Sequence, residues 1–398
     1  MTKNRNSDNK TMIFFWPNSI FENVHWKKEA GGICLGFKKI GYRVTLIVGK
    51  MNAIKNDTIK TIELNGKFKH NKNSEIVNLV RYLIFNIKEA INAVNIFIEI
   101  RPSIIVIEHL TYSSIFSIFI YKVFNSVENL KRINKNSEKK KFIVRLDIDP
   151  DYIKRLNYNK NAHWLFSYLK LSLASFLFDK IIVETKCAYD ELSKSNIFRR
   201  YYIKRLVVIP NGYINKNIKI NKNKGRKKVI LSVGRINFQK GFEFLIKSFK
   251  RVHKTYSDWQ LRIVGPIEDR EYYRQIENIV SSLHLENSVK FVGYLYGRKL
   301  DREYYNASIF CLLSRFESFG IARAEAIAHG LPMVISEAGC GIYYKKYGSI
   351  VVPIGDIDKS ARAIMKLIEN KKLRKKISKT QLKAILTWDE IAKIIDNI

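Results

Sequence analysis

The arrangement of apolar runs along the chain limits its fold more than any other feature. In the first half, short runs rich in Ile and Val alternate with longer amphipathic stretches. This alternation is typical of a parallel sheet with helices on both faces. The runs are "TMIFFW", "YRVTLIVG", "SIIVIEH", "KFIVRLD", "DKIIVE" and "RLVVIP".

The alternation restarts after the polar, basic stretch "NGYINKNIKINKNKGRKK". The second series reads "VILSVGR", "WQLRIVG", "VKFVGY", "SIFCLL", "PMVIS" and "SIVVP". With 398 residues, the chain is long enough for two cores. We therefore predict two α/β domains, 1–205 and 206–378, followed by a C-terminal helical segment, 379–398. In that segment the tail "LTWDEIAKIIDNI" has the pattern of a packed helix, with Ile391, Ile394 and Ile395 on one face.

The charge of the chain points to an anionic partner. The sequence has 71 Lys and Arg against 36 Asp and Glu, a net charge of +35. Nucleic acid, a phosphorylated substrate or an acidic membrane surface would each suit such a surplus, as would a plain excess of solvated lysines. Apart from "RRYYIKR" at Arg199–Arg205, basic and aromatic residues are not grouped as a nucleic-acid site requires, so we expect no nucleic acid.

Cysteine usage and hydropathy bear on the compartment. The four cysteines are far apart and form no C-x-x-C pair, which argues against a zinc site or a disulfide framework and favours a reducing compartment. We expect no signal peptide, because the chain opens with polar residues. The longest apolar stretch, "WLFSYLKLSLASFLFDKIIV", is interrupted by Lys170 and Asp179, which favours a buried helix followed by a strand over a membrane span. The expected location is cytoplasmic.

The segment "SRFESFGIARAEAIAH" follows an apolar run that suits a buried strand. The break "SFG" predicts a helix start, where unpaired amides attract anions. Glu317 precedes this helix and Glu325 lies two turns along it, so both carboxylates can face the side of the free amides. Those amides belong to Gly320, Ile321 and Ala322. A carboxylate accepting two hydrogen bonds suits adjacent hydroxyls of a sugar. Alternatively, Glu317 is a carboxylate favoured by the dipole at the helix start, and Glu325 is an exposed helix residue.

A second loop carries two cations. The strand in "VILSVGRINFQKGFEF" ends at Gly234, and Arg235 and Lys240 follow before the next helix. Ligands bind at this end of strands in open α/β sheets, and two cations there suit a diphosphate. Solvated lysine and arginine near a helix start would give the same pattern.

Taken together, these segments resemble a known family. The two glutamates around "ESFG", the "GLP" at Gly330, the "SVGR" with Lys240 downstream and the "VVIPNG" at Val207 resemble the retaining glycosyltransferases of family 4. The N-terminal "EAGGICLGFKKIGYRVTLIVG" and the final helix with Trp388 also fit. The resemblance implies the GT-B fold, in which two Rossmann-like domains face a cleft and a C-terminal helix returns to the first.

The resemblance also implies roles in the second domain. Arg235 and Lys240 would bind the leaving diphosphate of a nucleotide sugar, and Glu317 would contact hydroxyls of the donor sugar. Glu325 would hold the ribose. The remaining expected donor contacts are Gly234, Gly320, Ile321, Ala322 and Tyr294, the last beside the base.

In the first domain, Gly31 and Gly32 would let the backbone approach the donor phosphate and the acceptor, because a side chain there would block the cleft. Asp147, in "RLDIDPD", stands where many relatives have a histidine near the donor sugar. His109 is a second candidate for a contact with the sugar or the acceptor. Asp147 and Asp149 form a D-x-D, as in metal-dependent glycosyltransferases, but this motif recurs at Asp356 and we expect no metal.

The resemblance implies transfer of a sugar, with retention, from a nucleotide diphosphate sugar to a hydroxyl of a glycan or a lipid-linked acceptor, without a cofactor. The alternative is a protein of this fold that binds or epimerises nucleotide sugars. Cationic and aromatic stretches of the first domain, "YLIFNIK", "SIFSIFIYKVF" and "HWLFSYLKLSL", suit peripheral contact with an anionic membrane.

Overall fold

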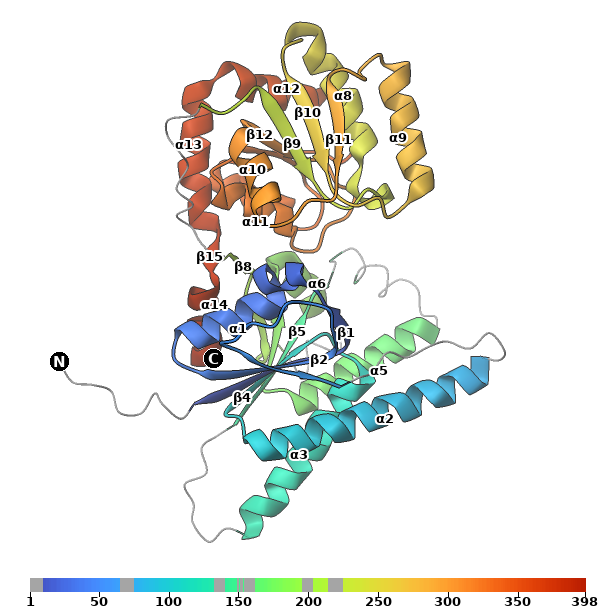
Figure 1. Ribbon diagram of the computed structural model, residues 1–398, viewed down its shortest axis with the longest axis vertical. Helices are drawn as coiled ribbons and strands as arrows, with labels where there is room; N and C mark the ends of the chain where they lie inside the picture. Colours follow the sequence, from blue (N-terminus) through green and yellow to red (C-terminus); the bar gives the residue numbers. More distant parts are fainter. Residues whose placement is uncertain are drawn as a thin grey trace, which may run out of the picture. The chain divides into compact units, whose positions relative to one another are not determined.

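The chain forms two compact units (Figure 1). The first unit comprises Met1–Gly212 and Trp388–Ile398, and the second comprises Tyr213–Thr387. The sequence places the corresponding boundaries after 205 and after 378. The computed structural model describes residues 10–64, 75–131, 140–148, 150, 153, 162–194, 203–213 and 225–398.

The first unit is built on a seven-stranded parallel sheet with the order β3-β2-β1-β4-β5-β6-β7. Strand order reverses between β1 and β4, which makes this the switch point of a doubly wound sheet. The expected parallel sheet is confirmed, and its polar edge strand β3 is an addition that the apolar runs did not predict. The strands are β1 (Thr11–Phe21), β2 (Arg43–Met51), β3 (Lys60–Glu63), β4 (Ile104–Glu108), β5 (Lys141–Leu146), β6 (Lys180–Val183) and β7 (Leu206–Val208).

Helices cover both faces of this sheet (Figure 1). On one face, Phe15 of β1 packs with Phe97 of α2 and Tyr121 of α3 in a single apolar core. On the other face lie α1 and α14, which pack against each other. The helices are η1 (Asn23–Lys27), α1 (Glu29–Lys39), α2 (Glu75–Ile100), α3 (Tyr112–Lys131), α5 (Ala162–Leu177), α6 (Lys186–Lys194) and α14 (Trp388–Asn397).

The second unit has a six-stranded parallel sheet with the order β11-β10-β9-β12-β13-β14. Each of the six apolar runs of the second series contains one of these strands. The order reverses between β9 and β12, so the loops that follow these two strands meet at the switch point. The strands are β9 (Val229–Val233), β10 (Gln260–Val264), β11 (Val289–Gly293), β12 (Ile309–Leu312), β13 (Met333–Ser336) and β14 (Ile350–Val352).

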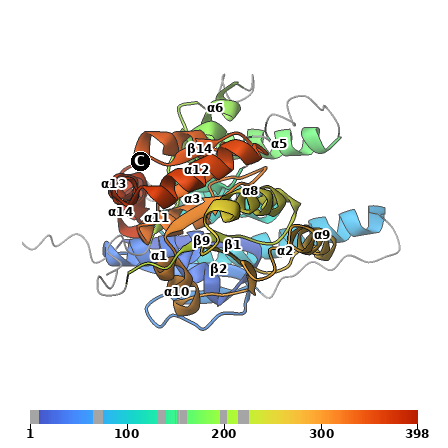
Figure 2. The same ribbon diagram turned by 90° about the horizontal axis from the view of Figure 1, so that it is seen from above.

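Alternating residues of these strands supply two cores. Ile230 of β9 belongs to the core under α8, α9, α12 and α13, whereas Leu231 belongs to the core under α10 and α11. Helices α8 and α12 pack side by side over the first of these cores (Figure 2). The helices are η2 (Phe238–Lys240), α8 (Phe242–Thr255), α9 (Arg270–Ser282), α10 (Arg298–Asn306), α11 (Ile321–Ala328), η3 (Gly341–Tyr347), α12 (Ile357–Glu369), α13 (Lys371–Gln381) and η4 (Leu382–Ala384).

Two short strands and one helix complete the chain. Strand β8 (Gly212–Tyr213) pairs with β15 (Leu386–Thr387), and α14 follows directly. Its buried face is formed by Trp388, Ile391, Ala392 and Ile395, whereas Ile394 is partly exposed, so the prediction that Ile394 packs inward was wrong. No helix among the described residues combines the length and apolar character needed to cross a bilayer.

Trp388 occupies the space over three glycines. A Cβ added to Gly32 would lie 2.2 Å from the Trp388 indole, and one added to Gly36 would lie 2.2 Å from its carbonyl oxygen. At Gly212 the same indole would be 2.8 Å away. The lack of side chains on these residues therefore forms the groove that receives the returning helix.

We expect Gly32→Ala to destabilise the first unit. Alanine would raise helix propensity, but the added methyl group would overlap Trp388, and overpacking of this kind costs about 1 to 3 kcal/mol. Urea unfolding of the full chain measures the change. Gly225→Ala, where an added Cβ has nothing within 4 Å, is the control and should unfold like the wild type. Equal stability of the two variants would contradict this packing.

Candidate functional site

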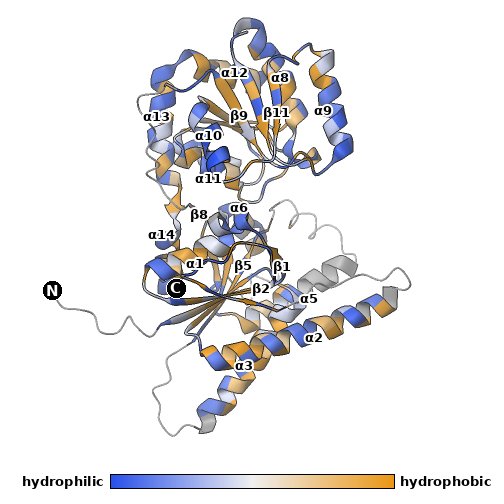
Figure 3. Cartoon of the chain, viewed as in Figure 1, coloured by the Kyte–Doolittle hydropathy of each residue, from blue (hydrophilic) through white to orange (hydrophobic). Residues whose placement is uncertain are grey.

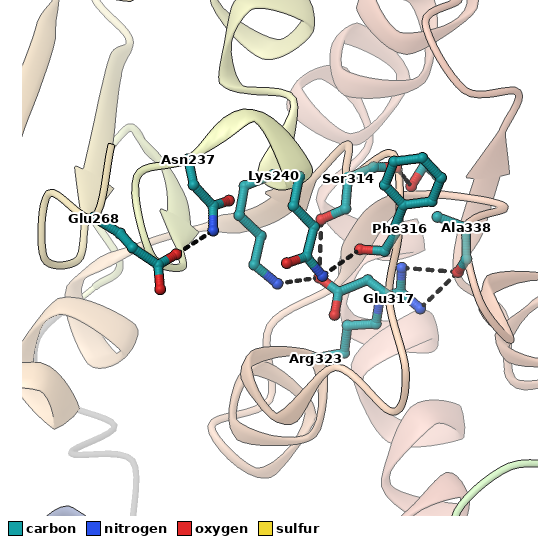
Figure 4. Close-up of polar contacts among 10 residues, drawn as sticks. Asn237, Lys240, Glu268, Ser314, Phe316, Glu317, Arg323 and Ala338 are labelled. Atoms are coloured by element: carbon teal, nitrogen blue, oxygen red, sulfur yellow. Dashed lines mark hydrogen bonds and ion pairs between the residues drawn. The ribbon is translucent and has the colours of Figure 1, made fainter. Parts of the chain in front are cut away.

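An ion pair joins the two loops at the switch point of the second unit. Lys240 Nζ lies 2.6 Å from Glu317 Oε1, and both side chains are almost fully buried. Ser314 Oγ donates a second hydrogen bond of 2.9 Å to the same carboxylate oxygen. The structure thus brings together one residue from each of the segments singled out in the sequence (Figure 4).

Glu317 carries its charge in a buried position. Burial alone would raise the pKa of this carboxyl, but the charges of Lys240 and Arg323 and the hydrogen bonds from Lys240 and Ser314 outweigh burial and lower it. Gly234 leaves room for this arrangement, because a Cβ there would lie 3.3 Å from the Lys240 side chain.

Arg323 is a fully buried cation that the sequence analysis missed. Both of its terminal nitrogens donate to the carbonyl oxygen of Ala338, at 3.2 Å each. Its Nε has no hydrogen-bond partner among the described residues. Arginine in "GIARAEA", a segment made of small and apolar residues apart from Arg323 and Glu325, is the signal that identifies it.

Further bonds hold the loops in register. Gln239 donates to the carbonyl oxygen of Phe316 at 3.0 Å, and Arg315 donates to that of Phe238 at 2.7 Å. Gly339 packs so closely that an added Cβ would lie 2.1 Å from the Glu317 carbonyl oxygen, and its φ of +60° favours glycine. The segment after β13 therefore fixes the backbone of Glu317.

The start of α11 lies just beyond Glu317. Gly320 precedes the helix with a φ of +77°, a conformation that residues with a Cβ rarely adopt. The helix has no side-chain cap and no acidic residue in its first turn. The amides of Ile321 and Ala322 therefore belong to a helix start that suits an anion.

Glu325 belongs to a separate polar cluster. Its Oε2 accepts a hydrogen bond of 2.7 Å from the hydroxyl of Tyr304, which is buried. Burial and the Glu325 charge both raise the pKa of Tyr304, so the hydroxyl remains a donor. The His329 ring stacks on Tyr304 with centroids 4.8 Å apart and thereby supports it. Tyr304 and His329 are further residues that the sequence analysis did not select.

Arg235 and Tyr294 lie on other loops of this unit. Arg235 pairs with Glu268, which also accepts a hydrogen bond from Asn237 (Figure 4). Tyr294 is exposed on the loop after β11 and stacks on Tyr296, with centroids 6.1 Å apart. Arg235 and Tyr294 thus form these contacts with residues other than Lys240 and Glu317.

The two N-terminal glycines have a structural explanation. A Cβ on Gly31 would lie 2.4 Å from the Cα of Trp26, and one on Gly32 would meet Trp388. A side chain at either position would therefore overlap packed protein, whereas the approach of their backbone to the donor phosphate and the acceptor stays a prediction.

His109 and Asp147 lie near each other at the end of the first sheet. His109 follows β4 with a φ of +63°, and its amide donates to the carbonyl oxygen of Arg145 at 3.1 Å. The surrounding protein lowers the pKa of His109 by desolvation, while the charge of Asp147 acts in the opposite direction. Asp147 itself is exposed.

A buried group of charges lies beneath these two residues. Arg145 pairs with Glu108 at 3.0 Å and with Glu184 at 3.2 Å, and it also donates to Asn211. Asn211 in turn donates to Glu29 at 3.3 Å. The signal in the sequence is a charged residue at the end of an otherwise apolar run, as in "SIIVIEH", "FIVRLD" and "DKIIVE", and the sequence analysis overlooked it.

The two D-x-D motifs, at Asp147 and at Asp356, differ in what the structure describes. Asp149 lies outside the described residues. Asp356 caps α12 by accepting a bond of 2.8 Å from the amide of Lys359, and Asp358 pairs with Arg251, so the second D-x-D serves the fold. The described part of the chain contains no group of three His, Cys, Asp or Glu residues arranged to hold a metal ion.

We expect Lys240→Met to cost about 3 kcal/mol of unfolding free energy, because it removes the bonded cation from a buried carboxylate. The double variant Lys240→Met/Glu317→Gln should recover most of this loss. Urea unfolding provides the measurement. Lys228→Met breaks the exposed pair with Asp258 and, as the control, should cost about 1 kcal/mol or less. A double variant no more stable than the single one would contradict the pairing.

The buried charges of the first unit predict a dependence on pH. Burial is the largest influence on Glu108 and raises its pKa to about 7. The folded state therefore holds this proton more tightly than the unfolded state, and stability falls as the pH rises from the ordinary glutamate value of 4.5 towards about 7.

We expect Glu108 to account for a loss of up to about 3 kcal/mol of unfolding free energy between pH 4.5 and 7.5. Glu108→Gln should remove that part of the dependence of stability on pH. Urea unfolding of both proteins across this range tests the assignment. Glu99→Gln, at an exposed position, should keep the wild-type slope. An unchanged slope in Glu108→Gln would refute it.

Comparison with known proteins assigns a family to the second unit. Residues 214–383 match the family model described as glycosyl transferases group 1. A glycosyltransferase of Haemophilus influenzae is 30% identical over 239 residues, which cover 58% of this chain and 63% of the relative. The mannosylfructose-phosphate synthase of Agrobacterium fabrum is 30% identical over 176 residues, 42% of this chain and 39% of the relative. The chain thus spans less than two thirds of either relative.

Solved structures match over nearly the whole chain. Sucrose-phosphate synthase from Thermosynechococcus elongatus has a TM-score of 0.65 at 17% identity and covers 98% of both chains. Anabaena HepE, solved with UDP and glucose, has a TM-score of 0.68 at 15% identity, over 97% of this chain and 98% of its own. These likenesses show the fold, which is GT-B. The family match, which covers residues 214–383, relates the second unit to the group 1 glycosyl transferases.

Proposed function

We propose that this chain is a retaining glycosyltransferase. It moves a sugar from a nucleotide diphosphate sugar to a hydroxyl of a glycan or a lipid-linked acceptor, and it needs no metal or other cofactor. The second unit binds the donor, and the first unit binds the acceptor.

The observation that carries this proposal is the buried pair of Lys240 and Glu317 beside the uncapped start of α11. A buried ion pair of this kind contributes little net stability, because desolvation offsets its attraction. At the switch point of a parallel sheet, however, it presents a cation and a carboxylate where ligands bind. Charge supports an anionic ligand there, since Arg235, Lys240 and Arg323 belong to this edge of the sheet, where Arg235 pairs with Glu268 and the charges of Lys240 and Arg323 act on Glu317.

The chemistry follows from these groups. As the bond between the anomeric carbon and the diphosphate oxygen breaks, negative charge builds on the leaving group. Lys240, Arg235 and the amides of Ile321 and Ala322 stabilise this charge more than they stabilise the bound donor, which accelerates the step. The acceptor hydroxyl attacks from the side the diphosphate leaves, and a diphosphate oxygen takes its proton. Retention at the anomeric carbon results.

Glu317 and Glu325 divide the recognition of the donor. With its charge held by Lys240 and Ser314, Glu317 accepts hydrogen bonds from the sugar. Glu325 accepts from the ribose hydroxyls, and Tyr304 acts as a positioning residue by donating to one carboxylate oxygen. The exposed Tyr294 lies beside the base. On the first unit, His109 and Asp147 contact the sugar or the acceptor.

Relatives and thiols add support. Anabaena HepE was solved with UDP and glucose, and a relative from Mycobacterium leprae is named as a phosphatidyl-myo-inositol mannosyltransferase, which supports a nucleotide donor and a lipid-linked acceptor for this chain. None of the four cysteines forms a disulfide, in line with our proposal of a cytoplasmic location.

A thermal-shift screen with UDP, GDP, ADP and their sugar conjugates, with and without EDTA, tests the donor site. We expect one nucleotide family to stabilise the protein regardless of EDTA. Lys240→Ala and Glu325→Ala should each lower the affinity for that nucleotide at least tenfold, because each removes a charged hydrogen bond. The controls Lys228→Ala and Glu369→Ala remove charged side chains from exposed bonds elsewhere in the unit and should bind like the wild type.

The products then decide the reaction. Proton NMR of the sugar transferred to an acceptor reports the anomeric configuration, and an inverted product rules out retention. Nucleotide binding without transfer to any acceptor would favour the alternative of a binding protein or an epimerase. If EDTA abolishes stabilisation by the nucleotide, the site depends on a metal ion, and Asp147 becomes the candidate ligand to test.

A further inference from the structure

Helix α2 carries an exposed apolar stripe. Val77, Val80, Ile84, Ile87 and Ile91 recur three and four residues apart, and each is exposed. Residues with this spacing share one side of a helix over about four turns. The buried side of the same helix, with Ala93 and Phe97, already packs on the sheet. The stripe is thus additional to the core. Hydrophobic residues recur along both α2 and α3 (Figure 3).

Two neighbouring helices continue this surface. Helix α3 packs against both α2 and α5. It exposes Phe119, whose side chain is 54% accessible, and α5 exposes Phe176, which is 68% accessible. The sequence favoured a buried helix here, but α5 is buried on one side, at Ala174, and exposed at Leu173 and Phe176. The apolar face, as we call it, consists of Val77, Val80, Leu83, Ile84, Ile87, Ile91, Phe119, Ile120, Val123, Phe124, Val127, Leu173 and Phe176.

So many exposed apolar side chains on three neighbouring helices are unusual for a protein in water, and a large exposed apolar surface normally marks an interaction site. The polar residues that border it identify the partner. Arg81 and Lys88 lie seven residues apart along one edge of the α2 stripe, and both are exposed. Among the described residues, neither has a carboxylate within ion-pair distance.

The other helices add charge of the same sign. Lys170 of α5 lies over the ring of Tyr112, 4.5 Å from its centroid, at the start of α3. Two carboxylates of α2 and α3 are paired, since Glu99 lies 3.8 Å from Lys60 and Glu128 lies 2.9 Å from Arg101, and Glu89 of α2 is buried. The border of the apolar face therefore carries net positive charge.

We propose that the apolar face docks on the surface of an anionic bilayer. Helices α2, α3 and α5 lie in the headgroup region, with their apolar side chains among the acyl chains and their arginine and lysine side chains on the lipid phosphates. The aromatic rings of Phe119 and Phe124 suit this boundary. No segment crosses the membrane in this arrangement, and docking requires no catalysis.

Charge argues against a second copy of the chain as the occupant. In a twofold dimer the same patch faces itself, so Arg81, Lys88 and Lys170 of one subunit would approach their like-charged equivalents. An anionic lipid surface instead offers these side chains opposite charge, as the net charge of +35 on the whole chain also favours.

Vesicle flotation of the full-length protein tests the proposal. Vesicles of phosphatidylcholine with about a third phosphatidylglycerol should carry the wild type upward, and pure phosphatidylcholine vesicles should carry at least tenfold less. Phe119→Gln/Phe176→Gln should reduce binding to the anionic vesicles at least tenfold, because two large apolar side chains leave the bilayer. The control pair Ile54→Gln/Ile354→Gln, at exposed positions outside the apolar face, should float like the wild type.

A second pair of variants isolates the charge. Arg81→Gln/Lys88→Gln should bind anionic vesicles about tenfold less tightly, whereas Lys371→Gln/Lys372→Gln, with the same loss of charge on α13, should not change binding. Lys240→Ala should float like the wild type, which separates docking from donor binding.

Three results would overturn docking: no flotation of the wild type with anionic vesicles, an equal loss in the control pairs, or a dimer in sedimentation velocity that Phe119→Gln/Phe176→Gln dissociates.

Discussion

The ion pair of Lys240 and Glu317 is the interaction on which the second unit's site depends. It joins the loops after β9 and β12, the two strands between which the sheet reverses its order. Since the pair is buried, neither charge is stable there without the other. Apolar side chains could fill this region without the cost of burying charge. The charged groups of Lys240 and Glu317 are what make the region suitable for a ligand.

The first unit places a comparable group of charges at the end of its own sheet, but with different consequences. Arg145 is shared among Glu108, Glu184 and Asn211, all of them buried. Carboxylates outnumber cations in this group, and burial raises the pKa of Glu108, Glu184 and Glu29. The second unit suits an anion because Lys240, Arg235 and the uncapped start of α11 lie at its switch point, whereas in the first unit burial and neighbouring carboxylates favour bound protons.

The sequence was sufficient to predict the two sheets and the part of the candidate site that contains Lys240 and Glu317. Twelve strands appear as apolar runs rich in Ile and Val and could be located, but β3 has the polar sequence "KTIE" and therefore no such run. The segments holding Lys240 and Glu317 could be selected because loops after strands meet at a switch point. Arg145 and Glu108 were missed because their pairing joins neighbouring strands that are distant in sequence. The reason for Gly32 was missed because it depends on Trp388, far along the chain.

The groove that Trp388 fills also determines which of the two units can complete its folding first during synthesis. The second unit is a continuous segment, whereas the first is completed only by α14, whose residues follow the second unit in the sequence. During synthesis, the glycine surface of α1 therefore stays exposed until the ribosome has passed Trp388, and the second unit can fold before the first is finished. A nascent chain of this protein must keep the earlier half soluble while the later half folds, which makes the first unit the part most in need of chaperone protection.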